Sequence, residues 1–309
     1  LVHALENFDQ DGIGELYRGK VRNNYAVGDE IIMVTTDRIS AFDKVLGTIP
    51  FKGQILTQIA RFWFDRTEDI ISNHIKSYPD PQVLVAHKAK TLPVEIIVRG
   101  YITGSLWREY SSGVNGQYGF MLPDDLKMNQ KFDKPIVTPT TKAEYGLHDE
   151  AISREQILKD GLVEESVYDR AVDASVKLFA RGQEWAAGRG LILVDTKYEF
   201  GIVDGKLILV DEVHTPDSSR YWMADEYEER YQKNTGQKML DKENIRQWLL
   251  DRGFSGEGTP PTLSDDIRAS LAQQYIELFE LLTGDSFQPE IGSVNDRIRA
   301  NLRKTGYVK

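Results

Sequence analysis

Residues 191–213 constrain the fold of this chain most strongly, because polar and apolar side chains alternate there on both sides of an Asp-Gly pair. Alternation with a period of two is typical of half-buried β-strands. We therefore predict two strands, 191–198 and 206–213, joined into a hairpin around Asp204-Gly205. One face of the first strand carries Asp195, Lys197 and Glu199, and the other carries Val194, Tyr198, Phe200 and Ile202.

The length of the turn decides whether the acidic residues of this hairpin meet. A two-residue turn at Asp204-Gly205 would place Glu199 and Asp211 on opposite faces. A three-residue turn that begins at Val203 would place them on the same face, with Lys197 beside them. Three-residue hairpin loops that end in a left-handed glycine are common, and we predict one here.

Two carboxylates brought this close repel each other unless a cation joins them. Mg²⁺ takes one or two protein carboxylates and completes its coordination with water and phosphate oxygens. Glu199 and Asp211 are therefore the predicted magnesium ligands. The alternative is an exposed, charged sheet face that Lys197 stabilises by pairing.

A second β-rich region, near the N-terminus, carries three cations at a spacing of two, Arg18, Lys20 and Arg22. On one strand they would share a face, where an anion relieves their repulsion, and Gly19 would let a backbone N–H approach that anion. We predict a β-hairpin that covers phosphate groups, as in kinase-like folds; a solvated strand face is the alternative. The next turn is expected at Gly28-Asp29. The chain has no Walker A sequence, which disfavours a P-loop nucleoside triphosphatase.

Two further segments place polar groups where a strand ends. Residues 99–105 begin with Arg99, after a short apolar strand, and contain two glycines and Ser105. Residues 37–43 follow another predicted strand in the same way. Each segment is a candidate binding loop, and each is equally consistent with an ordinary turn.

The segment after the acidic hairpin predicts an anion site at a helix start. We expect a helix over 221–231, capped by Asp217 or Ser218. Arg220 in its first turn opposes the usual dipole preference, which favours an anion clamp. A salt bridge from Arg220 to an acid such as Glu226 is the alternative.

The order of the remaining patterns indicates an α+β fold rather than regular βαβ alternation. Amphipathic periodicity predicts helices over 54–64, 163–187, 244–250 and 265–282, and the polar stretch 127–141 is expected to be an extended linker. We divide the chain into a β-rich N-terminal lid domain, 1–92, and a larger α+β domain, 93–309, with a central antiparallel sheet and a helical region from about 225 to 309.

Composition excludes several classes of function. The chain has no cysteine, so disulfides, thiolate-bound zinc and thiol catalysis are impossible, and a reducing, cytoplasmic location is expected. The five histidines show no metal-binding spacing. A net charge of −10 argues against a nucleic-acid partner. No apolar run approaches the length of a membrane span, so no membrane association is expected.

Several motifs taken together resemble one family, that of SAICAR synthetase in purine biosynthesis. They are LYRGKVR (16–22), TTDRISAFD (35–43), PVEIIVRGYITGS (93–105), TPTTKAEYGLHDE (138–150), LVDTKYEFG (193–201) and DEVHTPDSSR (211–220). The resemblance implies a fold related to ATP-grasp and kinase-like ATP sites. It also implies an ATP- and Mg²⁺-dependent ligase that joins carboxyaminoimidazole ribotide (CAIR) to L-aspartate, giving SAICAR, ADP and phosphate.

The same resemblance implies roles for individual residues. Gly19, Lys20 and Arg22 would line the triphosphate, with Lys20 also catalytic, and residues 88–92, beginning at Lys88, would form the adenine hinge. Glu199 and Asp211 would hold Mg²⁺. The residues implied to bind CAIR and its phosphate are Arg99, Ser105, Asp195, Lys197, Asp217 and Arg220, with Ser40 and Asp43 on the substrate side.

Two other functions use the same features. A small-molecule kinase would need the phosphate-covering hairpin and the metal carboxylates but no aspartate. A non-catalytic nucleotide sensor would need only the nucleotide site, although such a module is expected to have lost its metal pair. The sequence leaves the oligomeric state open.

Overall fold

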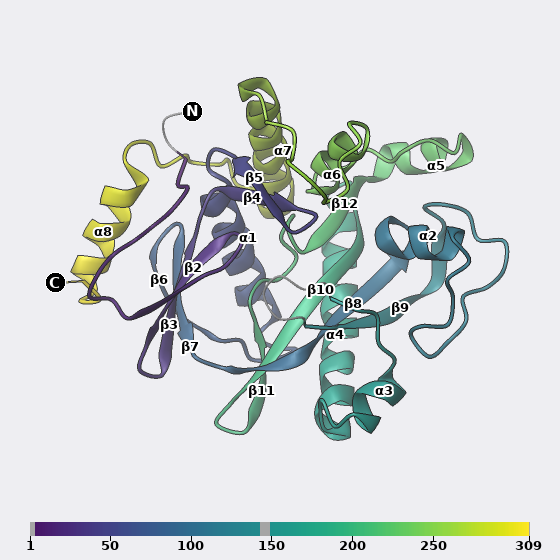
Figure 1. The fold of residues 1–309 in the computed structure, drawn as a ribbon, viewed down its shortest axis with the longest axis horizontal. Helices are drawn as coiled ribbons and strands as arrows, with labels where there is room; N and C mark the ends of the chain where they lie inside the picture. The colour runs from purple at the N-terminus through teal and green to yellow at the C-terminus, as the bar shows by residue number, and fades with distance from the viewer. Residues whose placement is uncertain (1–3, 143–148, 309) are drawn as a thin grey trace.

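The computed structural model describes residues 4–142 and 149–308 and contains two larger antiparallel sheets, a two-stranded sheet and flanking helices (Figure 1). His148, within the motif at 138–150, lies outside the described residues. The separation of antiparallel sheets from helices along the chain confirms the predicted α+β class.

The first sheet is built mainly from the N-terminal quarter of the chain. Its strand order is β1 (Glu15–Arg18), β2 (Arg22–Val27), β3 (Glu30–Thr35), β7 (Val83–His87) and β6 (Ile75–Asp80). Val27 pairs with Glu30, which confirms the two-residue turn at Gly28-Asp29. A separate hairpin, β4 (Arg38–Ala41) and β5 (Lys44–Thr48), follows β3.

The prediction that three cations share one strand face is wrong. The run divides into β1 and β2, and residues 19–21 form the turn between them. Arg18 therefore ends one strand, Lys20 stands in the turn, and Arg22 begins the next strand. Gly19 closes the turn, since its N–H donates to the carbonyl of Arg22 at 2.8 Å. The three side chains reach different partners.

The second sheet forms the centre of the molecule (Figure 1). Its strands are β11 (Lys206–Val210), β10 (Leu191–Val203), β8 (Lys90–Tyr101) and β9 (Lys131–Thr141), in that order, with β12 (Ser219–Met223) also paired to β10. The expected linker over 127–141 is thus wrong for most of its length. Phe132 and Thr138 are buried and the strand pairs with β8, so polar composition concealed a strand.

The predicted three-residue turn of the acidic hairpin is also wrong. Val203 pairs with Lys206, so the turn has two residues, and both Asp204 (φ 50°) and Gly205 (φ 73°) are left-handed. This is the conformation that two-residue hairpins favour because its twist matches that of the strands. Glu199 consequently lies opposite Val210, and β11 ends there.

The predicted helix over 221–231 begins three residues later. Residues up to Met223 belong to β12, and α5 spans Ala224–Gln232. Arg220 is therefore a strand residue, paired in register with Asp195, and it is not in the first turn of a helix. The anion-clamp argument from the helix dipole does not hold for it.

Helices cover the faces of both sheets. They are α1 (Lys52–Thr67), α2 (Gly104–Ser111), α3 (Arg154–Lys159), α4 (Glu165–Ala187), α5, α6 (Glu243–Leu250), α7 (Asp265–Thr283) and α8 (Val294–Lys304). The main core forms where α4 packs on β8 and β10 and α1 packs on α7. Trp63, Phe62 and Trp185 meet edge-to-face there.

The C-terminal helix returns to the first sheet. In Figure 1, α8 lies beside β6, far along the chain from the strands that it covers. Ile298 and Leu302 share a buried cluster with Leu5 and Phe8. Residue 92, the proposed domain boundary, lies within β8, and the division stays a prediction. Within the described ranges, no helix has the length and apolar character needed to cross a membrane.

Candidate active site

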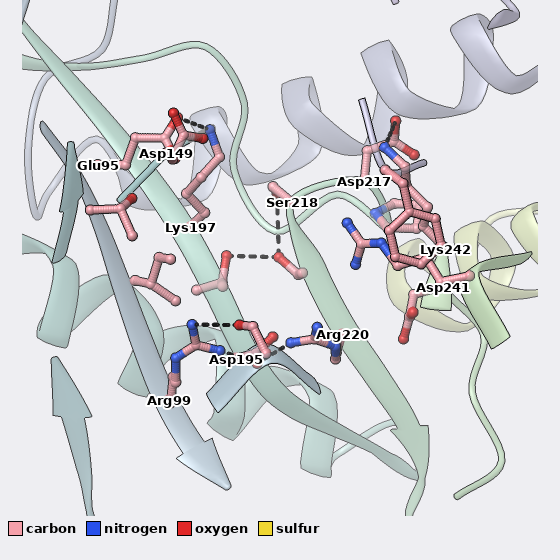
Figure 2. Close-up of a pocket in the computed structure, with 18 of the residues that line it drawn as sticks. Glu95, Arg99, Asp149, Asp195, Lys197, Asp217, Ser218, Arg220, Asp241 and Lys242 are labelled. Carbon is pink, nitrogen blue, oxygen red and sulfur yellow. Dashed lines mark hydrogen bonds and ion pairs between the residues drawn. The ribbon is translucent and has the colours of Figure 1, made fainter. Parts of the chain in front are cut away.

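A cavity of about 410 Å³ opens above the second sheet, between α2, α6 and the β4–β5 hairpin (Figure 2). Its volume falls within the usual range for small-molecule sites. Its charged lining residues are Asp43, Glu95, Arg99, Arg108, Asp149, Asp195, Lys197, Asp217, Arg220, Asp241, Lys242 and Arg246. All the substrate residues implied by the sequence line it, except Ser40. Ser40 is buried in β4.

Two arginines meet over one carboxylate at the base of this cavity. Figure 2 shows Asp195 between Arg99 and Arg220, to both of which it is ion-paired. The Arg99–Asp195 distance is 3.3 Å, and Arg99 also donates to the Thr138 hydroxyl at 2.8 Å. Arg99 and Asp195 are buried and the Arg220 side chain is 12% exposed, so these charge-assisted contacts orient both guanidinium groups. Ser105, whose hydroxyl lies 3.5 Å from Nη2 of Arg99, is the second residue of α2.

Arg220 fits against the start of α2 only because residue 104 is glycine. A Cβ on Gly104 would lie 2.2 Å from the Nη2 atom of Arg220, and the backbone there is left-handed (φ 58°). The arginine also pairs with Glu243 of α6 at 3.2 Å. These contacts bring three elements to one point, and an anion there would meet two guanidinium groups and a helix N-terminus.

Two residues beyond Asp195 on β10, a lysine joins two carboxylates. Lys197 contacts Glu95 at 2.6 Å and also contacts Glu199. Burial raises the pKa of Glu95 to about 7, although Lys197 opposes this shift. Burial would raise the pKa of Glu199 too, but Lys197 and Lys142 outweigh it and hold that pKa well below its usual range. Glu199 is therefore charged near neutral pH.

The third cluster surrounds Asp217, which is buried at the edge of the cavity. Its carboxylate accepts from Lys52 at 2.7 Å and from the Tyr275 hydroxyl at 2.9 Å, and Lys242 lies 3.5 Å away. Burial alone would raise the pKa of Asp217, but Lys242 and Lys52 hold it well below its usual range. Burial lowers the pKa of Lys242.

A smaller cavity of about 160 Å³ lies between the two sheets. Lys88, Glu199 and Asp211 line it together with Asn24 and His74. The backbone N–H of Lys88 donates to the Asp29 carbonyl at 2.8 Å. Among the described residues, neither the Asn24 Oδ1 atom nor the His74 Nε2 atom has a hydrogen-bond partner, although both atoms are buried. Unsatisfied buried polar atoms are costly, so a ligand with complementary groups would relieve both.

Glu199 and Asp211 thus border one cavity although the predicted register was wrong. The reason is the backbone of Asp211, which leaves the strand at φ 69° and breaks the alternation of faces. Asp211 is ion-paired to Arg22, and the pair Glu199–Lys142 stands nearby. A carboxylate on β10 and one just beyond the end of β11 are oxygen donors of the kind that Mg²⁺ prefers.

The N-terminal hairpin reaches the acidic residue Asp211 through Arg22. Arg22 contacts Asp211 and lies 3.2 Å from Glu212, and Lys20 is ion-paired to Asp43 at the rim of the larger cavity. Arg18, the third cation, points away and pairs with the exposed Asp9. Within the described part of the chain, no cluster of three or more acidic or histidine side chains forms a complete metal site.

Sequence reasoning missed several charged residues of the site. Lys142 lies in the motif quoted at 138–150, so the sequence could have identified it. Arg108, on α2, shares a helix face with Ser105 three residues earlier. Lys52 and Lys242 gave no usable signal, because a lysine near a helix start is ordinarily solvated.

Comparison with known proteins decides the family. The model of the SAICAR synthetase family matches residues 15–261, most of the chain. The chain belongs to the SAICAR synthetase family. A phosphoribosylaminoimidazole-succinocarboxamide synthase of Bacteroides thetaiotaomicron is 50% identical over 301 residues, 96% of each chain. One from Cytophaga hutchinsonii is 48% identical and covers 96% of this chain and 97% of its own.

Solved structures of the SAICAR synthetase family share the fold. The SAICAR synthase of Saccharomyces cerevisiae, complexed with SAICAR, is 36% identical and superposes with a TM-score of 0.80, covering 92% of this chain and all of that one. A Type-2 SAICAR synthetase in complex with ADP is 26% identical, with a TM-score of 0.68 and coverage of 89% and 100%. The family predicted from the motifs is therefore confirmed.

Proposed function

We propose that the chain is an ATP-dependent ligase that joins the carboxylate of CAIR to the amine of L-aspartate, releasing SAICAR, ADP and phosphate. The observation that carries this proposal is the Lys197–Glu199 ion pair, which joins the two cavities. Lys197 lines the larger cavity and Glu199 lines the smaller one. A nucleotide in one and a carboxylate substrate in the other would meet at this pair.

A carboxylate is a poor electrophile, so the reaction needs activation before an amine can attack. The CAIR carboxylate attacks the γ-phosphorus of ATP, and the bond to the β,γ-bridging oxygen breaks to release ADP. The aspartate amine then attacks the acyl carbon, loses a proton and expels inorganic phosphate. Each step moves negative charge onto phosphoryl oxygens, which Lys20 and Arg22 would offset from the hairpin above.

Glu199 and Asp211 would hold Mg²⁺. When bound, the ion neutralises charge on the transferred phosphoryl group. The cations that these carboxylates now contact, Lys142 and Arg22, would be released toward the phosphates. The unpartnered Asn24 Oδ1 and His74 Nε2 atoms would face the adenine, with the hinge at Lys88 beside them.

The larger cavity would take the second and third substrates. Arg99, Ser105 and Arg220 would bind the CAIR phosphate at the start of α2. Lys197, Asp195 and Asp217 would contact the ribose and imidazole, and Asp43 borders the same space. Ser40 is buried in β4 and would affect the cavity only indirectly, because the β4–β5 hairpin carries Asp43.

One assay tests the reaction. The purified protein is supplied with Mg-ATP, CAIR and L-aspartate, each is omitted in turn, and ADP and SAICAR are followed by mass spectrometry. Multiple-turnover ADP formation is expected only in the complete mixture. Sustained ADP release without aspartate would instead indicate a small-molecule kinase, and nucleotide binding without any turnover would indicate a sensor.

A further inference from the structure

Arg38 lies directly beneath the turn that joins β1 and β2. It is the first residue of β4, and only 6% of its surface is exposed. Its charge takes no part in either cavity, since it lines neither of them. Its guanidinium group instead makes contacts with the backbone of the turn.

The carbonyl groups of the turn point toward residues 36 and 38. The Nε atom of Arg38 donates to the carbonyl of Lys20 at 3.0 Å, and Nη2 donates to that of Gly19 at 2.9 Å. The carbonyl of Val21 accepts from the Thr36 backbone N–H at 3.0 Å and from its hydroxyl at 2.7 Å. The carbonyl groups of three successive residues, 19–21, are thus held on the side of the turn that faces Thr36 and Arg38.

Peptide planarity fixes what the other side presents. The C=O and N–H of one trans peptide point in opposite directions. Because the carbonyls of Gly19 and Lys20 face Arg38, the N–H groups of Lys20 and Val21 face away from it. In the described ranges of the chain, neither of these two N–H groups has a protein acceptor. Successive free N–H groups form a concave site for an anion.

We propose that Arg38 is a positioning residue that orients this turn, so that two backbone N–H groups and the Lys20 ammonium converge on the nucleotide phosphates. The inference rests on the proposed function, because it assigns the turn to the nucleotide. Arginine suits the role because its planar group offers five donors in fixed directions, which a lysine cannot reproduce. Its other donors reach the Glu6 carbonyl at 2.6 Å and the Asn23 side chain at 3.0 Å.

The test compares Arg38→Lys with a matched control, Arg268→Lys. Arg268 also donates to backbone, to the Thr48 carbonyl at 2.7 Å and to the Thr48 hydroxyl at 2.8 Å on β5, and within the described residues none of its hydrogen bonds reaches residues 19–21. Calorimetry measures the dissociation constants for ADP and for CAIR in each full-length variant. Arg38→Lys should weaken ADP binding about tenfold or more, the equivalent of one charged hydrogen bond. CAIR binding should change by less than about twofold, and Arg268→Lys should change neither constant.

A milder variant covers the case in which Arg38→Lys does not fold. Thr36→Val removes one of the two donors to the Val21 carbonyl and should weaken ADP binding about threefold. Unchanged ADP affinity in the folded Arg38→Lys protein would overturn this inference but not the proposed function. Where Arg38→Lys does not fold, unchanged ADP affinity in Thr36→Val would have the same consequence. Equal losses for ADP and CAIR would also overturn it, because they indicate a general structural role. Failure of the unmodified protein to bind ADP would overturn the proposed function as well.

Discussion

The buried ion cluster around Asp217 offers a sharp test of how the site is stabilised. Lys52 is fully buried, and Asp217 is the carboxylate that it contacts, at 2.7 Å. Within the described residues, no second carboxylate lies within ion-pair distance of Lys52. Asp217 itself has two further partners, Tyr275 and Lys242. The two single substitutions are therefore unequal.

Asp217→Asn leaves the Lys52 ammonium buried without a counter-charge, a loss that typically costs about 3–5 kcal/mol. Lys52→Met leaves Asp217 with Tyr275 and Lys242, so its cost should be smaller, about 1–3 kcal/mol. The double variant removes both charges together. It should be more stable than the sum of the single losses predicts, with a coupling of up to about 3 kcal/mol.

Thermal unfolding at pH 7.5 measures these differences, since Asp217 is ionised there in the folded and unfolded states alike. For a chain of 309 residues each kcal/mol shifts the midpoint by roughly 1–2 °C, so Asp217→Asn should lower it by roughly 3–10 °C. The single and double variants form one cycle on the same protein. Additive effects, within about 0.5 kcal/mol, would refute the coupling. A more stable Asp217→Asn than Lys52→Met would refute the assignment of the buried charge.

Three further predictions concern the proposed magnesium ligand Asp211, the contact of Arg220 with Gly104, and the stability of the protein in acid. Asp211→Asn should lower kcat about 10²-fold or more while the chain stays folded, because Arg22 keeps Glu212 as a partner at 3.2 Å, and a normal kcat at saturating Mg²⁺ would contradict the metal assignment. Gly104→Ala should raise KM for CAIR about tenfold while KM for ATP stays constant, because the added Cβ displaces Arg220. Burial lowers the pKa of His74 to about 3, so between pH 6.5 and 3 the unfolded state binds the proton and the folded state does not. His74→Gln should therefore remove about 2 kcal/mol of the stability change between pH 7.5 and 5.0 in urea unfolding, and an identical pH dependence would show that His74 is protonated when folded.

Local sequence patterns predicted the long helices better than they predicted the turns and boundaries between helices and strands. The amphipathic runs at 163–187 and 265–282 became α4 and α7 with nearly the same bounds, because each has a long apolar stripe that only a helix can bury on one side. The strand β9 was missed because Lys131, Asp133 and Lys134 face solvent, and a strand covered on one face looks polar by composition.

The acidic hairpin shows how two residues can border one cavity although their predicted register is wrong. Alternation along a strand predicts which face a residue takes only while the backbone remains extended. Asp211 stands one residue beyond β11 and takes a left-handed conformation, which no periodicity argument anticipates. Arg220 was misplaced for a similar reason, since the boundary between β12 and α5 has no proline or glycine to mark it.

The charge arrangement suits an acidic chain to the anionic substrates of the proposed reaction. The key cations of the smaller cavity and the hairpin each contact a carboxylate, as Lys142 does Glu199 and Arg22 does Asp211. These internal pairs keep the free protein from holding unbalanced charge at low dielectric, which is costly. Binding of a metal ion to the carboxylates and of phosphates to the cations would replace each pair by two new ones of the same kind. The exchange leaves the net charge around each group almost unchanged, so the site can be stable both before and after its ligands arrive.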